Sequence, residues 1–173
     1  MEFSIKSTAP GRSKTECAVI GIFESRTLSA AARELPSAAR SYVEKIVKSD
    51  MEGSAGTTLV LHEVPGVECK RLMLVGLGAE KTFADRQYRD AVATAVRALV
   101  QLGVAEAEIH LSRLKIAGRD AARTAAQAVQ ITRETLYSFQ ALKSAKKKNP
   151  RLSRITIGVA AADVREAQKQ CLR

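Results

Sequence analysis

Apolar and polar residues follow two different periods along this chain, and the two periods predict strands that alternate with helices. Six stretches are apolar almost throughout or alternate apolar with polar residues, which is the pattern of strands. These stretches span 3–7, 17–23, 57–64, 71–77, 109–111 and 155–159. The strands that are apolar almost throughout predict a sheet that is covered on both faces.

Helical periodicity fills most of the intervals between these strands. The expected helices begin after Thr27 or Ser29, at Ser37, after a capping box at Thr82 and Asp85, near Arg119, and after an N-cap at Asp163. Pro36 ends the first helix and Gly103 the third, and the fourth runs to about Leu142. The order of elements predicts a three-layer α/β/α domain with a mixed, mostly parallel sheet of about six strands.

The last helix bears on the domain organisation. It places Val164, Ala167, Cys171 and Leu172 on one face, and no Gly, Asn or Pro follows to end it. We therefore expect residues 1–162 to form one domain, and residues 163–173 to begin a helix that leads into the rest of a longer protein.

Composition narrows the class of protein. The chain has 173 residues, of which 46% are hydrophobic and 27% charged, as in a folded domain with its own core. Neither a secretory signal nor an apolar run of the ~18 residues that cross a bilayer is present, so no membrane partner is expected. Cys17, Cys69 and Cys171 lie far apart and form no CxxC pair, which favours a reducing, cytoplasmic compartment.

Positive charge gathers in the C-terminal part of the sequence. The net charge is +10: residues 1–103 hold 14 basic and 12 acidic side chains, and residues 104–173 hold 14 and 6. The densest basic run consists of Lys143, Lys146, Lys147, Lys148, Arg151 and Arg154. This run has two interpretations, a contact with the phosphates of duplex DNA or a solvated loop.

Catalytic signals are absent from the sequence. Gly76-Leu77-Gly78 follows a strand and precedes a helix, where a phosphate could bind, but a tight turn that needs a positive φ explains it better. His62 and His110 fall in predicted strands and are interpreted as structural residues with satisfied nitrogens. The sequence has no GxSxG elbow, HExxH motif or paired carboxylates, so no catalytic or metal-binding residue is assigned to it.

Several stretches together resemble a known family. They are 57–65 (TTLVLHEVP), 71–81 (RLMLVGLGAEK), 86–89 (RQYR), 118–120 (GRD) and 133–139 (RETLYSF). In this order and spacing they resemble the N-terminal domain of bacterial leucyl (cytosol) aminopeptidases, the M17 metallopeptidases. The resemblance covers essentially the whole chain.

The resemblance implies a macro-domain-like fold and a parent hydrolase that removes N-terminal residues from peptides. In this family two divalent metals, zinc or manganese, and the catalytic lysine and arginine belong to the C-terminal domain. The hallmark of that domain, Asn-Thr-Asp-Ala-Glu-Gly-Arg, is not in this sequence. The implied partners are the C-terminal catalytic domain and the other subunits of a hexamer, and some bacterial members also bind DNA. Macro domains elsewhere bind ADP-ribose, a function that likeness of fold does not transfer.

Overall fold

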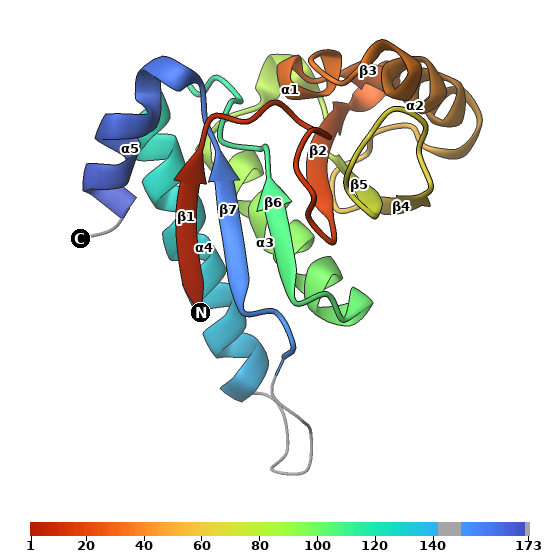
Figure 1. Ribbon diagram of the computed structural model, residues 1–173. Coiled ribbons are helices and arrows are strands. Elements are labelled where there is room, and N and C mark those ends of the chain that lie inside the picture. The colour runs from red at the N-terminus through yellow and green to blue at the C-terminus, as the bar shows by residue number, and fades with distance from the viewer. Residues whose placement is uncertain (142–149, 172–173) are drawn as a thin grey trace.

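A central sheet lies between two layers of helices in the computed structural model, which describes residues 1–141 and 150–171 (Figure 1). The strands are β1 (Glu2–Lys6), β2 (Ala18–Phe23), β3 (Thr27–Leu28), β4 (Thr58–His62), β5 (Arg71–Gly76), β6 (Glu106–Ile109) and β7 (Arg154–Gly158). The helices are α1 (Ala30–Arg33), α2 (Ser37–Asp50), α3 (Asp85–Leu102), α4 (Ala121–Ala141) and α5 (Val164–Cys171). The predicted α/β/α architecture is confirmed.

The sheet has the strand order β1-β7-β6-β2-β5-β4. Its pairs are parallel except for β4, which runs antiparallel to β5, so the prediction of a mixed, mostly parallel sheet is also confirmed. The short β3, which pairs antiparallel with β2, was not predicted, because two residues are too few to show a period.

Successive side chains of the central strands enter two separate cores. On one face, Val19 of β2 packs in a core that α3, α4 and α5 complete; on the other, Ala18 and Ile20 pack with α1 and α2. Because both faces are covered, every residue of β2 is buried, which is why its sequence is apolar throughout. Figure 1 shows α3 and α4 behind β1, β7 and β6, with α5 beside β1.

The last helix shares the core of the domain. Ala167 and Cys171 of α5 are buried against the α3 and α4 side of the sheet. Asp163 is the last residue of a 3₁₀ turn, Ala161–Asp163, that continues directly into α5, so the helix does not begin with a side-chain cap from this residue. No helix among the described residues is both long and apolar enough to cross a bilayer.

Several predicted boundaries were wrong, for identifiable reasons. The strand expected at 109–111 runs from Glu106 to Ile109, because two glutamates interrupt its apolar pattern. The capping box at Thr82 does not form: Thr82 belongs to a 3₁₀ turn, and the Phe83 ring packs edge-on against Phe23 before α3 begins. Instead, the backbone N–H of Ala84, the N-cap residue of α3, donates to Gln87 Oε1 at 3.2 Å.

Two helix boundaries follow the predicted signals, and the end of one strand does not. Ser29, not Thr27, caps α1, and its Oγ accepts a hydrogen bond from the Ala32 N–H at 3.3 Å. Gly103 ends α3 with φ 77°, as a C-terminal glycine does. The β4 strand ends at His62, two residues earlier than expected, because Glu63 adopts a left-handed conformation with φ 53°.

Candidate functional site

The sheet has a topological switch point between β2 and β6. The chain leaves β2 through α1 and α2 toward β4 and β5, and it leaves β6 through α4 toward β7, so the connections after these two neighbours run in opposite directions. In open α/β sheets, ligands bind in the crevice that such diverging connections leave at the carboxyl ends of the strands. The topology therefore directs attention to this edge.

A crevice of about 510 Å³ lies at this edge. It is bounded by α1, by the segment 112–116 after β6, by the first turns of α4 and by residues 160 and 163 after β7. Its volume lies within the range of roughly 300–1,000 Å³ that small-molecule sites occupy. We call it the switch-point crevice.

Arg113 ties the two sides of the switch-point crevice together. Its Nη1 forms an ion pair with Glu34 at the end of α1, and its Nη2 donates to the Val159 carbonyl after β7 at 3.3 Å. The side chain is only 13% exposed, and its Nε is buried without an acceptor among the described residues. Burial lowers the pKa of the Arg113 guanidinium, although the ordinary value is so high that the group keeps its charge.

A buried tyrosine supports the floor of the crevice. The Tyr88 hydroxyl of α3 donates to the Thr124 carbonyl of α4 at 2.9 Å and lies 3.2 Å from Ser112 Oγ. Burial raises the pKa of the Tyr88 phenol, which therefore remains neutral. At the rim, Arg119 pairs with Asp85 at 2.7 Å. The helices and the loop around the crevice are thus held by specific polar contacts.

Two charged side chains of the crevice have no partner within the described parts of the chain. Lys115 is exposed and Asp163 is half-buried, and neither forms an ion pair or a side-chain hydrogen bond there. One cation and one anion therefore remain available to a bound molecule.

The histidines do not belong to this crevice. His110 follows β6 and is 1% exposed, and its Nε2 lies 3.0 Å from Glu108 Oε1. Neither ring nitrogen of His110 has a hydrogen-bond partner among the described residues, contrary to the expectation of satisfied nitrogens, so the contact with Glu108 is the polar contact recorded for the ring there. The ring packs against Gly158, where an added Cβ would lie 2.3 Å from Nδ1. His62 is exposed at the end of β4.

The glycine turn after β5 is closed to ligands. The backbone N–H groups of Gly76, Leu77 and Gly78 all donate to protein carbonyls, at 2.8–2.9 Å. Gly78 has φ 79°, as the tight-turn interpretation requires. With its donors already used, this turn offers no cradle for a phosphate.

The predicted basic run is only partly described. Lys143, Lys146, Lys147 and Lys148 lie outside the described residues. Arg151 is exposed, whereas Arg154 contacts Glu2 at 3.5 Å and Glu106 at 3.7 Å, which offsets part of its charge.

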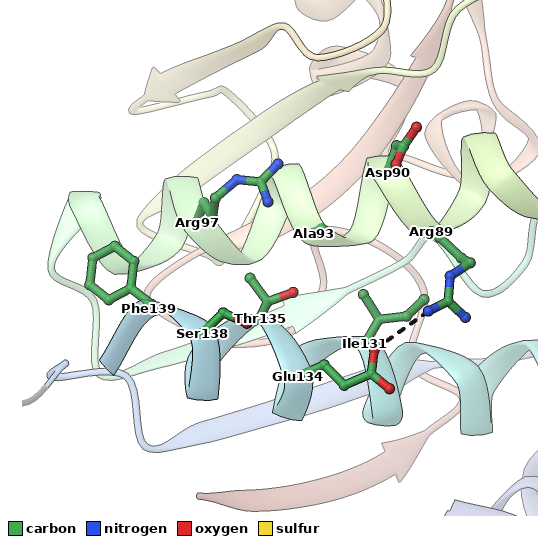
Figure 2. A pocket seen from close by; sticks show the side chains of 9 residues that line it. All are labelled: Arg89, Asp90, Ala93, Arg97, Ile131, Glu134, Thr135, Ser138 and Phe139. Atoms are coloured by element: carbon green, nitrogen blue, oxygen red, sulfur yellow. Dashed lines mark hydrogen bonds and ion pairs between the residues drawn. The ribbon is translucent and has the colours of Figure 1, made fainter. Parts of the chain in front are cut away.

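Two surface hollows on the helical layer were not predicted. Figure 2 shows the first, a groove of about 420 Å³ between α3 and α4, where Arg89 reaches across to Glu134 at 3.4 Å. The second, of about 500 Å³, is ringed by arginines of α3 and α4 and of the turn before α4, and no acidic residue lines it. These arginines are Arg89, Arg119, Arg123 and Arg133. The available signal was the i, i+4 spacing of Arg119 and Arg123 in the helix that the sequence placed from about Arg119, although Arg119 lies in the turn before α4.

The described residues do not fit a metal site. Among residues 1–141 and 150–171, no three His, Cys, Asp or Glu side chains gather where they could share a metal ion.

Burial raises the pKa of Cys17 to about 12 and those of Cys69 and Cys171 to about 11, so these thiols stay protonated. The interpretation of Cys17 as a small core residue is confirmed.

Sequence comparisons identify relatives of the chain. Residues 19–146 match the model of the cytosol aminopeptidase family, N-terminal domain. A probable cytosol aminopeptidase of Dechloromonas aromatica is 42% identical over 161 residues, which are 92% of this chain and 32% of that protein. One of Halorhodospira halophila is 42% identical over 171 residues, or 97% of this chain and 34% of that protein. The chain thus spans about a third of the length of these relatives.

Solved structures agree on the fold. A tomato leucine aminopeptidase mutant matches with a TM-score of 0.64 at 16% identity, covering 98% of this chain and 35% of that one. The macro domain of ganglioside induced differentiation associated protein 2 matches with a TM-score of 0.65 at 11% identity, covering 97% and 81%. At such identities the likeness concerns the fold alone, and it confirms the macro-domain-like architecture.

Proposed function

The chain belongs to the cytosol aminopeptidase family, as its N-terminal domain, and on this basis we propose that it is a non-catalytic accessory domain of a cytoplasmic leucyl aminopeptidase. The observation that carries the proposal is the family match over residues 19–146, combined with a described part that offers no set of metal ligands. The parent enzyme would remove N-terminal amino acids from peptides.

The chemistry of that reaction is proposed for the part of the relatives that this chain does not span. Two divalent metals, zinc or manganese, would polarise the peptide carbonyl and activate water there. No step of the reaction is assigned to residues of this chain. Its role would be to shape access to the active site of its partner domain and to support a hexamer.

A peptidase assay tests this proposal. The purified 173-residue chain, supplied with Mn²⁺ or Zn²⁺, should release no ammonia from leucinamide, while the Dechloromonas aromatica relative provides the positive control. Metal-stimulated cleavage by the chain alone would overturn the assignment of a non-catalytic role.

Duplex DNA is a second proposed partner. The observation that favours it is the ring of four arginines over α4. Arg89 and Arg119 are offset by ion pairs with Glu134 and Asp85, but Arg123 and Arg133 form no ion pair among the described residues and would add to the basic run at 143–154. Contacts with phosphates release counterions, so affinity should fall steeply between about 50 and 200 mM salt. Replacing Arg123 and Arg133 with Gln should flatten that salt dependence in a fluorescence-anisotropy titration. An unchanged slope would remove this surface from the proposal.

A further inference from the structure

The switch-point crevice combines an apolar lining with one unpaired charge of each sign. We propose that it binds a small zwitterion with an aliphatic side chain, namely an α-amino acid of the leucine type. The prediction of a zwitterion follows from the two unpaired charges of the crevice. The choice of an aliphatic amino acid rests on the proposed function, because such amino acids are the products that a leucyl aminopeptidase releases.

The apolar part of the ligand has a place in the crevice. Leu114 and Ile116 are less than a tenth exposed and line the crevice from the segment after β6. Ala30, Ala121 and Ala160 line it from three other elements, and their short side chains leave room beside the larger ones. An aliphatic side chain of four carbons would be removed from water between these surfaces, and this burial of apolar surface favours binding.

The charged ends of the ligand have partners of the right sign. Lys115 is free to meet the carboxylate. Asp163 is free to meet the ammonium group, and Glu34 pairs with Arg113 through Oε2. A monoanion would leave Asp163 unpaired, and a monocation would leave Lys115 unpaired.

Two other hollows and the glycine turn suit this ligand less well. In the groove between α3 and α4, Arg89 and Glu134 neutralise each other, and the two further charged residues that line it, Asp90 and Arg97, are exposed on the surface of α3. The arginine ring over α4 has no acidic residue in its lining to receive an ammonium group. The glycine turn has donated its backbone N–H groups to the protein. The switch-point crevice differs from these sites in lying at the topological switch point of the sheet, where open α/β folds bind ligands, and in holding a half-buried carboxylate, that of Asp163.

Calorimetric titration of the 173-residue chain tests the proposal with four small ligands. L-leucine should bind. Leucinamide lacks the carboxylate and 4-methylpentanoate lacks the ammonium group, and each should bind at least tenfold more weakly. Glycine keeps both charges but lacks the side chain, and it should also lose at least tenfold. Leucinamide or 4-methylpentanoate binding as well as leucine would overturn the zwitterion, and no heat with 20 mM leucine would overturn the site.

Two variants locate the site. Lys115→Gln and Asp163→Asn should each weaken leucine binding about fivefold or more, because each removes one charged partner. Lys45→Gln and Asp50→Asn, exposed positions on α2, are the matched controls and should leave the affinity unchanged. Since all four side chains are at least partly exposed, circular dichroism should show folded proteins. Leucine binding that persists unchanged in both test variants would place it elsewhere.

Titration with a dipeptide distinguishes a free amino acid from a peptide as the ligand of the crevice. Leucyl-leucine is also a zwitterion with aliphatic side chains, but its charges lie farther apart. Binding at least tenfold weaker than that of leucine supports the free amino acid, and equal or tighter binding overturns it in favour of a peptide. Because binding is measured without turnover, a negative result leaves the accessory role intact, and an active chain in the peptidase assay leaves the crevice to be judged by its own titration.

Discussion

Two turns at the carboxyl edge of the sheet lead from a central strand into a long helix, yet they differ in what they leave open. After β5, the backbone N–H groups of Gly76, Leu77 and Gly78 donate to the carbonyls of Thr57, Ile22 and Gly53. After β6, the chain bends around a crevice of about 510 Å³ and buries Arg113 with one N–H unpartnered among the described residues.

The difference follows from the position of each strand in the sheet. The β5 strand pairs with the antiparallel β4, and the segment before β4 folds over the end of β5, where the Ser54 carbonyl approaches Gly76. The β6 strand lies at the switch point, from which neighbouring connections diverge. The glycines therefore mark close packing of backbone on backbone, whereas room for a ligand arises from strand order.

The largest expected effect concerns the closed turn. In Gly76→Ala the new Cβ would lie 2.0 Å from the Ser54 carbonyl oxygen and 2.4 Å from Thr57 Oγ1. Both contacts are far inside van der Waals distance, so the loop must move, and we expect a loss of about 3 kcal/mol in the free energy of unfolding. Urea denaturation followed by circular dichroism measures it.

Gly56→Ala is the control for this prediction. Gly56 lies in the segment before β4, two residues after Ser54, and has φ 84°, but nothing lies within 4 Å of an added Cβ. It should lose only the cost of a left-handed alanine, about 1 kcal/mol. If both variants lost the same small amount, the turn after β5 would have room, and its contrast with the crevice would disappear.

The closed turn could be predicted from the sequence, because its signals are local. The glycines of 76–78 stand between an apolar strand and a helical stripe, and a positive φ follows from that placement alone. The continuous apolar runs of β2 and β5 likewise predicted strands buried on both faces. Local patterns of this kind determined most elements and the fold class.

The crevice could not be predicted, because its contacts join residues that are distant in sequence. Arg113 pairs with Glu34, 79 positions away, and the Tyr88 hydroxyl donates a hydrogen bond to the carbonyl of Thr124, 36 positions away. No periodicity or motif around Arg113 predicts these contacts. The strand that leads to it was also misplaced, since buried Glu108 interrupts the apolar pattern of β6. Strand order, which brings these segments together, is a property of the whole chain.

A smaller effect is expected for the support beneath the crevice. Tyr88→Phe removes a buried hydroxyl and leaves the Thr124 carbonyl without this donor, which should cost about 1.5 kcal/mol in the free energy of unfolding at pH 7. Tyr137→Phe is the control, because Tyr137 is 74% exposed and should change stability by less than about 0.5 kcal/mol. Equal losses in the two variants would mean that the hydroxyl does not hold the floor.

The difference in stability between Tyr88→Phe and the unmodified chain should also depend on pH. Burial raises the pKa of the Tyr88 phenol, whereas the unfolded chain ionises its tyrosines near pH 10. Above that pH the unfolded state releases a proton that the folded state retains, so the contribution of the phenol to stability is complete below pH 10 and falls above it by about 1.4 kcal/mol per pH unit. Tyr88→Phe has no phenol to ionise at this position. Its deficit relative to the unmodified chain should therefore shrink between pH 9 and pH 11 in urea titrations, while Tyr137→Phe, with an exposed ring, should follow the unmodified chain. A deficit that stays constant over this range would show that water reaches Tyr88, and the floor of the crevice would then be as open as its mouth.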